Sequence, residues 1–332
     1  MKKIIVAVLV VLLAASAAWG QSKVITRPVT IVCAFSAGGG TDQVNRGLAE
    51  GMKEYLGVQV NVINTTGAGG GVAMDYVWQK PRDGLNILGI SETGLFVPAN
   101  AAHTTTAKDW QWFWAGGSPG VVLVPENSKY KTIKELIDDA KARPGQVKAA
   151  CSVLPGIWSI RWMTMMNAAG VKTNVLPYAG SAPSVTAALT GEVDIVHVSV
   201  GEALQYMQAK KLRPLVASEV EGTDVPGVGK VQPITDFYPD LKKVLPMPQL
   251  LGIAVPMDTP KEIKDEITKA FDAAMKSGAV KKVLEAQVAT PFGWSGEKAN
   301  TMSKSLESKF SWMLVDLNLA KKNPAELGIP KP

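Results

Sequence analysis

The chain has 332 residues, of which 46% are hydrophobic and 19% are charged, and its formal net charge at pH 7 is +6. This length is sufficient for two domains of ordinary size. The basic residues are spread along the chain without a cluster of interleaved aromatics, which argues against a nucleic-acid partner. Two histidines and two cysteines, far apart in sequence, give no spacing for a metal site.

The N-terminal segment has the pattern of a secretory signal peptide. Lys2 and Lys3 precede an unbroken apolar run from Ile4 to Ala15, and small residues continue to Gly20. This run is too short to span a bilayer comfortably, which disfavours the alternative of a membrane anchor. We predict a cleaved signal peptide over residues 1–20 and an exported mature protein without a membrane span.

The first predicted strand and helix enclose a glycine turn. Val29–Phe35 is a short apolar, β-branched run that predicts a buried strand, and Ser36–Gly40 supplies small residues for a tight turn. A helix then begins near Thr41 and Asp42, with apolar residues at helical spacing. Bare backbone amides at such a turn, together with the positive end of the helix dipole, favour an anion. We expect Asp42 to cap or orient its own loop, because its carboxylate would repel an anion.

A second glycine loop follows the next strand. Val58, Val60 and Val62 alternate with polar residues and predict a half-buried strand, after which residues 64–71 are rich in glycine. A helix to Trp78 and a third strand over residues 85–90, directly before Ser91, complete the rhythm of a parallel sheet covered by helices. The sequence therefore predicts an α/β fold with two glycine turns above the carboxyl end of one sheet.

The rest of the chain continues this α/β pattern in a second unit, with helices added at the end. Further strands are predicted over residues 110–114, 121–124, 147–151, 175–177, 191–198, 212–218 and 249–255. Further helices are predicted over residues 133–142, after residue 159, around residues 185–189, and over 203–209, 260–276, 279–288 and 303–320. Residues 219–248 are rich in Gly, Pro and Asp and are predicted to form a long surface connection. The apposed loop ends of the two units would form a cleft suited to a small ligand.

Tryptophans and cysteines within the strands are expected to be structural. Trp110, Trp112 and Trp114 alternate along one strand, which favours core packing over stacking on a ligand. Cys33 and Cys151 both have apolar neighbours. We expect them to be buried and free, although two cysteines in an exported chain could also pair.

Motifs for cofactor binding and catalysis fail on spacing or context. A dinucleotide-binding loop would need glycine where the chain has Gln43 and Val72, and we predict no cofactor. Residues 116–120 match the G-x-S-x-G pattern of esterases, but a strand rather than a helix is predicted to follow Ser118. Only His103 and His197 could serve as its base. We therefore expect no enzyme, and a secreted serine hydrolase using Ser118 is the alternative from another class.

Several separate motifs occur in an order that indicates a family. They are Phe-Ser-Ala-Gly-Gly-Gly-Thr-Asp (35–42), Asn-x-x-Gly-Ala-Gly-Gly (64–70), Asp-Gly (83–84), Pro-Tyr-Ala-Gly-Ser-Ala-Pro (177–183), Leu-Thr-Gly-Glu-Val-Asp (189–194), Lys-Leu-Arg-Pro-Leu (211–215) and Gly-Ile-Ala-Val-Pro-Met-Asp-Thr-Pro (252–260). From about Arg27 to the C-terminus, the chain resembles the extracytoplasmic solute receptors of tripartite tricarboxylate transporters, also called Bug proteins.

The resemblance implies a fold, a location and a function. The implied fold is the α/β, type 2 periplasmic-binding-protein fold, with one lobe over residues 21–122 and 251–332, a second lobe over 123–250, and a ligand cleft between them. The implied function is a periplasmic receptor that captures an organic acid and delivers it to the large and small membrane subunits of a transporter. We expect a monomer. A sensory receptor with the same fold is an alternative that the sequence does not distinguish.

The resemblance also implies a binding site, with one departure from the family pattern. A ligand carboxylate is expected against main-chain groups of the two glycine loops, faced by residues 178–181 of the second lobe. The loop Ser152–Ser159 lacks the family's usual hydroxyl-rich sequence and gains Trp158, with Ser159 as a replacement hydroxyl, which favours an aromatic or aliphatic ligand body over citrate. His197, on an apolar strand, is either a hydrogen-bonded core residue or a ligand contact. The predicted ligand-binding residues are Phe35, Ser36, Ala37, Gly38, Gly39, Thr41, Asp42, Gly67, Ala68, Gly69, Ser91, Trp158, Ser159, Tyr178, Ala179, Gly180 and His197.

Overall fold

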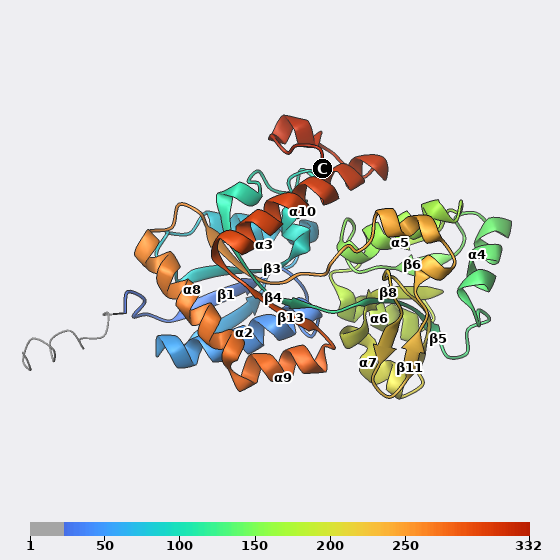
Figure 1. Ribbon diagram of the computed structural model, residues 1–332, viewed down its shortest axis with the longest axis horizontal. Coiled ribbons are helices and arrows are strands. Elements are labelled where there is room, and N and C mark those ends of the chain that lie inside the picture. The colour runs from blue at the N-terminus through green and yellow to red at the C-terminus, as the bar shows by residue number, and fades with distance from the viewer. Residues whose placement is uncertain (1–22) are drawn as a thin grey trace, which may run out of the picture.

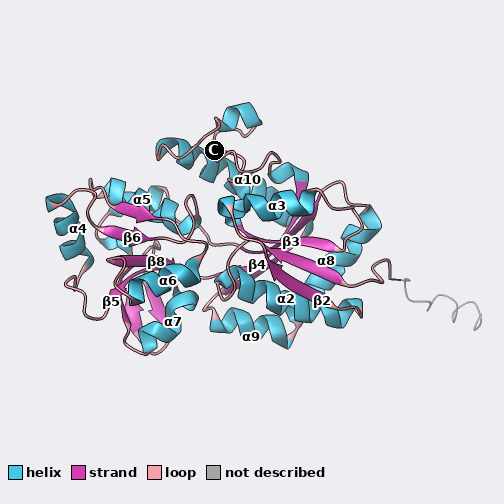
Figure 2. Ribbon diagram, turned by 180° about the vertical axis from the view of Figure 1, so that it is seen from behind, coloured by secondary structure: helices cyan, strands magenta, loops and turns pink. Residues whose placement is uncertain are grey.

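A computed structural model describes residues 23–332, so the predicted signal peptide over residues 1–20 lies outside the described residues. Within the described part, the strands form a six-stranded sheet in the order β13-β4-β12-β3-β1-β2 and a five-stranded sheet in the order β7-β6-β8-β5-β9. A two-stranded hairpin, β10-β11, is added to the second. The two larger sheets, each with its helices, form two lobes side by side (Figures 1 and 2). The α/β fold with two lobes is thus confirmed.

The first lobe is a mixed sheet covered by helices on both faces. β1 pairs in parallel with β2 and β3, whereas β12 runs antiparallel to β3 and β4, and β13 antiparallel to β4. Helices α2, α8 and α9 lie on one face, and α3 and α10 on the other (Figure 1). The bounds are β1 Val29–Cys33, α2 Gly40–Leu56, β2 Val60–Asn64, α3 Gly71–Trp78, β3 Asn86–Ser91, β4 Trp110–Gly117, β12 Leu251–Pro256, α8 Lys261–Lys276, α9 Gly278–Ala286, β13 Thr290–Trp294 and α10 Gly296–Asp316.

The packing of α2 follows from its sequence. Val44, Leu48 and Met52 recur at helical spacing and are almost completely buried against the sheet and α8. The helix ends at Gly57, which adopts the left-handed conformation that glycine tolerates best. At Gly51 a β-carbon would lie 2.8 Å from Ala274, so the close approach of α2 to α8 requires glycine.

The second lobe has the same layered construction. β6 pairs in parallel with β7 and β8, and β5 runs antiparallel to β8 and β9. The bounds are β5 Gly120–Pro125, α4 Ile133–Ala142, β6 Lys148–Ala150, α5 Ile157–Ala168, β7 Asn174–Leu176, α6 Ser181–Leu189, β8 Ile195–Ser199, α7 Val200–Gln208, β9 Leu212–Ala217, β10 Thr223–Val225 and β11 Gly229–Val231.

Both lobes also contain short 3₁₀ helices. They occupy Ala68–Gly70, Glu92–Leu95, Ala107–Asp109, Ile234–Asp236, Pro239–Lys243 and Pro324–Leu327.

The chain passes between the lobes at two places. The first is the two-residue link between β4 and β5, and the second is the segment that leads to β12 (Figure 1). Because β5 belongs wholly to the five-stranded sheet, we propose a lobe boundary at residues 118–119 in place of 122, and a second boundary before Leu251.

The described structure differs from the sequence-based expectations at three elements. Residues 219–248 are not a simple surface connection, because they form the hairpin and two 3₁₀ turns and bury Ile234, Leu241 and Met247. Their apolar residues are spaced irregularly among Gly, Pro and Asp, so no helical or strand period was visible. Strand β13 was missed, and α10 begins seven residues before the predicted Ser303 because its first turns are polar.

The predictions about tryptophans and cysteines are confirmed. The three alternating tryptophans of β4 are fully buried, and the Trp112 and Trp114 rings stack with centroids 5.2 Å apart. Cys33 and Cys151 are free and buried. Burial raises the pKa of the Cys33 thiol to about 12, which leaves it protonated and unreactive. None of the helices in residues 23–332 has the length and apolar character needed to cross a membrane.

Candidate ligand-binding cleft

A narrow cleft lies between the lobes, lined by residues of both. One part of its lining carries hydroxyl groups from both lobes, on Thr41, Ser91, Thr93, Ser152 and Ser181. Another part is apolar and comes from the loop and helix start at Val153, Ile157 and Trp158, together with Phe35 of the first lobe. The complete lining is Phe35, Gly39, Gly40, Thr41, Ser91, Glu92, Thr93, Ser152, Val153, Gly156, Ile157, Trp158, Gly180, Ser181, Glu202 and Gln249.

The amides of the first glycine turn have partners within the chain, which corrects the expectation that they are bare. The Gly38 N–H donates to Asp42 Oδ2 at 2.9 Å, and the Gly39 N–H donates to the Ser36 carbonyl at 3.3 Å. The Gly40 N–H donates to Oε1 of Glu202 in the second lobe at 2.9 Å. The carboxylates bonded to the amides of Gly38 and Gly40 therefore belong to the protein.

Asp42 orients its own loop, which is the role expected from the sequence. Its carboxylate accepts hydrogen bonds from the Gly38 amide, the Arg46 guanidinium and the Asn64 side chain. Burial opposes ionisation of this carboxyl, but the bonds from Arg46, Gly38 and Asn64 outweigh burial and hold the pKa of Asp42 below its ordinary value. Through Asn64, Asp42 also fixes the strand end that leads into the second glycine loop.

The second glycine loop opens into a neighbouring crevice between the lobes. Gly67, Ala68 and Gly69 line this crevice with Tyr178 and Ala179 of the second lobe, and Val153 borders both the crevice and the cleft. The lobes approach closely here, because a β-carbon at Gly69 would lie 3.5 Å from the Pro155 carbonyl oxygen. At Gly180 a β-carbon would lie 2.5 Å from the Ser36 hydroxyl, so glycine is needed where the loops of the two lobes meet.

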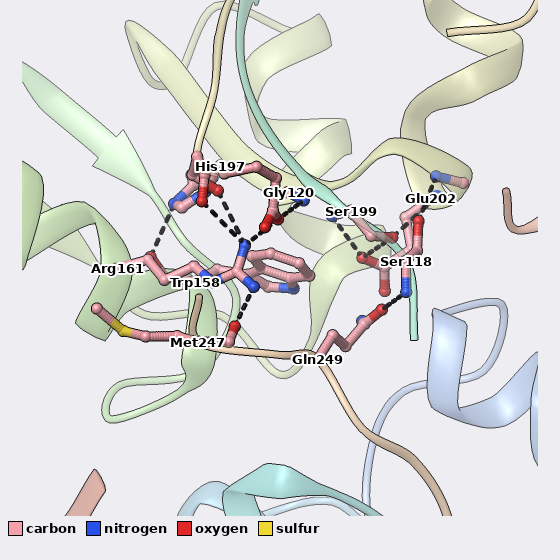
Figure 3. Close-up of polar contacts among 12 residues, drawn as sticks. Ser118, Gly120, Trp158, Arg161, His197, Ser199, Glu202, Met247 and Gln249 are labelled. Atoms are coloured by element: carbon pink, nitrogen blue, oxygen red, sulfur yellow. Dashed lines mark hydrogen bonds and ion pairs between the residues drawn. The ribbon is translucent and has the colours of Figure 1, made fainter. Parts of the chain in front are cut away.

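Two glutamates in the cleft were not predicted from the sequence. Glu202, in the first turn of α7, accepts from the Gly40 amide with one oxygen. Its other oxygen accepts from the amide and hydroxyl of Ser199 (Figure 3). Glu92 follows β3 and is almost fully buried. Its carboxyl accepts from the Leu250 amide at 2.7 Å. Burial raises the pKa of Glu92 to about 7.

A polar network ties the two interlobe segments to α5 (Figure 3). The buried Arg161 guanidinium pairs with Glu219 at 2.6 Å, donates to the Met247 carbonyl and lies over the Trp158 ring. Glu219 in turn accepts from the Gly120 amide at 2.8 Å, just after the first crossing. Gln249, on the second crossing, accepts from the amide of Ser118 on the first at 2.9 Å.

His197 and Ser159, both named as site residues, do not line the cleft. His197 is fully buried, with Nδ1 against the Trp158 carbonyl and Nε2 against the Ser218 hydroxyl, both at 2.8 Å. Burial, followed by the charge of Arg161, lowers the pKa of His197 to about 3 and keeps the ring neutral. Ser159 Oγ bonds the backbone of Gly156 at the start of α5. The structure thus gives both residues roles within the second lobe.

The other predicted residues are divided among the cleft and its neighbours. Phe35, Gly39, Thr41, Ser91, Trp158 and Gly180 line the cleft itself. Gly38 lines an adjacent groove beside Gln43 and Gln287. Ser36 and Asp42 accept hydrogen bonds from amides of the first turn, and Ala37 is exposed. Lining residues outside the predicted loops are Glu92 and Thr93, directly after the predicted Ser91, and Glu202 and Gln249. Only their positions could have indicated them in the sequence: Glu92 and Thr93 follow a strand, Glu202 lies near the start of a helix, and Gln249 lies where the chain crosses between the lobes. Lining residues that lie within the predicted loops but were absent from the predicted set are Gly40, Ser152, Val153, Gly156, Ile157 and Ser181.

Ser118 lacks the surroundings of an esterase nucleophile. It lies in the link between strands β4 and β5, not at the start of a helix, and its hydroxyl accepts from the Gly201 amide at 3.3 Å. His197 directs both ring nitrogens to other atoms. Within residues 23–332, no group of three or more His, Cys, Asp or Glu side chains is placed to hold a metal ion.

Two α/β lobes, joined by two crossings and separated by a cleft, form the bilobed fold of type 2 periplasmic binding proteins. The sequence profile described as "Tripartite tricarboxylate transporter family receptor" matches residues 44–318. The chain belongs to this family.

Individual relatives agree with this assignment. The chain is 27% identical over 302 residues to the "UPF0065 protein in tcbD-tcbE intergenic region" of Pseudomonas sp. (strain P51), covering 89% of this chain and 87% of the relative. Among solved structures, periplasmic binding protein BugD superposes with a TM-score of 0.81 at 22% identity, covering 90% of this chain and 99% of BugD. R. palustris Rpa4515 with adipate superposes with a TM-score of 0.78 at 22% identity, covering 89% and 99%. At these identities the superpositions establish the fold alone.

Proposed function

We propose that this protein is a periplasmic receptor that captures an organic carboxylate with an aromatic or aliphatic body and delivers it to the large and small membrane subunits of a tripartite transporter. The observation that carries the proposal is the composition of the cleft lining, in which five hydroxyl-bearing residues occur together with an apolar wall of Val153, Ile157 and Trp158. Hydroxyl donors suit a carboxylate, and the apolar wall suits a hydrocarbon body.

Affinity in this proposal comes from closure of the lobes around the ligand. Closure excludes water and strengthens each hydrogen bond between a hydroxyl or amide and the ligand carboxylate. The proposed contacts from the sequence-based set are Phe35, Gly39, Thr41, Ser91, Trp158 and Gly180. Citrate fits this arrangement poorly, because its several carboxylates need donors on all sides and the apolar wall offers none. The structure of a neighbour with adipate supports an organic acid as the ligand class.

A thermal-shift screen of organic acids, followed by calorimetry, tests the ligand. An acid that binds only the folded protein stabilises it by about 2.7 kcal/mol at a hundred times its Kd. We expect the largest shifts with hexanoate, benzoate and similar monoacids, and little shift with citrate. Much tighter binding of citrate than of these monoacids would contradict the proposed ligand class. A pull-down from membranes tests delivery, since recovery of a sensory kinase in place of transporter subunits would favour the sensing alternative.

A further inference from the structure

Glu202 connects the two lobes at the edge of the cleft. Its backbone belongs to α7 of the second lobe, where Oε2 accepts from the amide and hydroxyl of Ser199 at 3.0 and 2.8 Å. Its other oxygen, Oε1, accepts from the Gly40 amide of the first lobe at 2.9 Å. Capping of α7 accounts for the contacts of Oε2 but not for the bond to Gly40 across the cleft.

The position of Glu202 is the one that the sequence assigned to a ligand carboxylate. Gly40 begins the 17-residue helix α2, whose N-terminus attracts negative charge. The neighbouring amides of Gly38 and Gly39 are already bonded to Asp42 and to the Ser36 carbonyl. A carboxylate of the protein therefore occupies the anion-favouring end of the first glycine turn.

The cleft offers no positive side chain to balance a further anion near Glu202. Among the described residues that line it, none is Lys, Arg or His, and both ionisable residues are glutamates. The nearby Arg161 guanidinium is paired with Glu219 and lies at the Trp158 ring. A second negative charge at this end would meet like-charge repulsion in a partly desolvated space.

We propose that Glu202 is a specificity-determining residue that, bonded to the Gly40 amide in the closed protein, excludes ligands with a second carboxylate. A monocarboxylate can direct its charge to the hydroxyl groups and its body to the apolar wall. A linear dicarboxylate has a charge at both ends, and a second carboxylate directed to the first glycine turn meets Glu202 at the Gly40 amide. Discrimination thus comes from a repulsive group as well as from attractive contacts. The selectivity in this inference rests on the proposed function, whereas the bond between Glu202 and Gly40 does not depend on it.

Calorimetry with hexanoate and adipate tests the selectivity, because the two acids have the same carbon chain and differ by one carboxylate. We expect the wild-type protein to bind hexanoate at least tenfold more tightly than adipate, and Glu202→Gln to reduce that ratio at least fivefold by improving adipate binding. Glu135→Gln is the matched control, since Glu135 caps α4 of the same lobe through Thr132 and does not reach the first lobe. An unchanged ratio in Glu202→Gln, or a wild-type preference for adipate, overturns the proposal.

Small-angle X-ray scattering of the ligand-free protein tests the bond between the lobes. Glu202→Ala is expected to have a larger radius of gyration than the wild-type protein, because the lobes lose this contact, whereas Glu135→Ala is expected to keep the wild-type value. Identical scattering from all three proteins means that the Glu202 bond does not hold the lobes together, and it overturns the proposal. If no acid in the screen binds the wild-type protein, the proposed function fails, while the scattering comparison still decides the role of Glu202.

Discussion

Replacement of Arg161 by methionine is expected to destabilise the protein strongly, because this side chain bonds the second interlobe segment directly and the first through Glu219. The guanidinium is 1% exposed and makes a 2.6 Å ion pair with Glu219. It also donates to the Ser218 hydroxyl at 3.1 Å and to the Met247 carbonyl. Methionine preserves much of the apolar volume but supplies none of these donors, so Glu219 would keep its charge without a cation.

The size of the effect follows from burial. Removing one partner of a buried ion pair typically costs about 3–5 kcal/mol, because the remaining charge is left uncompensated. For a chain of this size, each kcal/mol lowers the melting temperature by roughly 2 °C, so Arg161→Met is expected to melt about 6–10 °C below the wild-type protein. Arg143 is a matched control, since it pairs with Asp139 on the surface of the same lobe and is 41% exposed. Arg143→Met is expected to lose much less stability than Arg161→Met, because solvent screens a surface ion pair.

Calorimetry and urea unfolding of four proteins would measure the effect. They are the wild-type protein, Arg161→Met, Glu219→Gln and the double variant. We expect the double variant to lose less than the sum of the single variants, with a coupling of about 1–3 kcal/mol, because both charges leave together. Equal losses for Arg161→Met and Arg143→Met, or additive losses in the double variant, would refute the reasoning.

Three further predictions concern pH, binding and catalysis. Burial raises the pKa of Glu92 from 4.5 to about 7, so ionisation of this residue lowers the free energy of unfolding by up to about 3 kcal/mol as the pH rises through that range. The melting temperature of Glu92→Gln relative to that of the wild-type protein should therefore increase between pH 5 and pH 8. A difference that stays constant with pH would contradict this. Gly39 has φ −75°, a backbone conformation that valine can also adopt, so Gly39→Val should remain folded by circular dichroism. It should lose binding of the acid found in the screen, because the valine side chain blocks approach to the backbone of the turn. Retained affinity would show that this turn is not part of the site. Ester substrates should be hydrolysed no faster by the wild-type protein than by Ser118→Ala, and activity lost with the hydroxyl would establish the hydrolase alternative.

The sequence alone determined the local structure and the family. The period of Val44, Leu48 and Met52 predicted α2 with its buried face, and the alternating tryptophans predicted a buried strand. Glycine turns between strand and helix located one wall of the cleft, because backbone conformation and side-chain period are encoded over a few neighbouring residues. Trp158, the unusual residue of its loop, lines the cleft, and its contact with a ligand stays a prediction.

Only the tertiary structure decided which groups occupy the glycine turn and the lobe crossings. Gly40 and Glu202 are 162 residues apart, and Arg161 and Met247 are 86 residues apart. No local period relates such residues, so Glu202 could be recognised from sequence only as a residue in the first turn of a helix. The sequence also left open whether His197 is a core residue or a ligand contact. The fold brings the Trp158 carbonyl and the Ser218 hydroxyl to its two ring nitrogens, and these distant partners give it a role in the core. Short-range preferences therefore set the elements, whereas contacts between distant segments set the charge and the partners of the cleft.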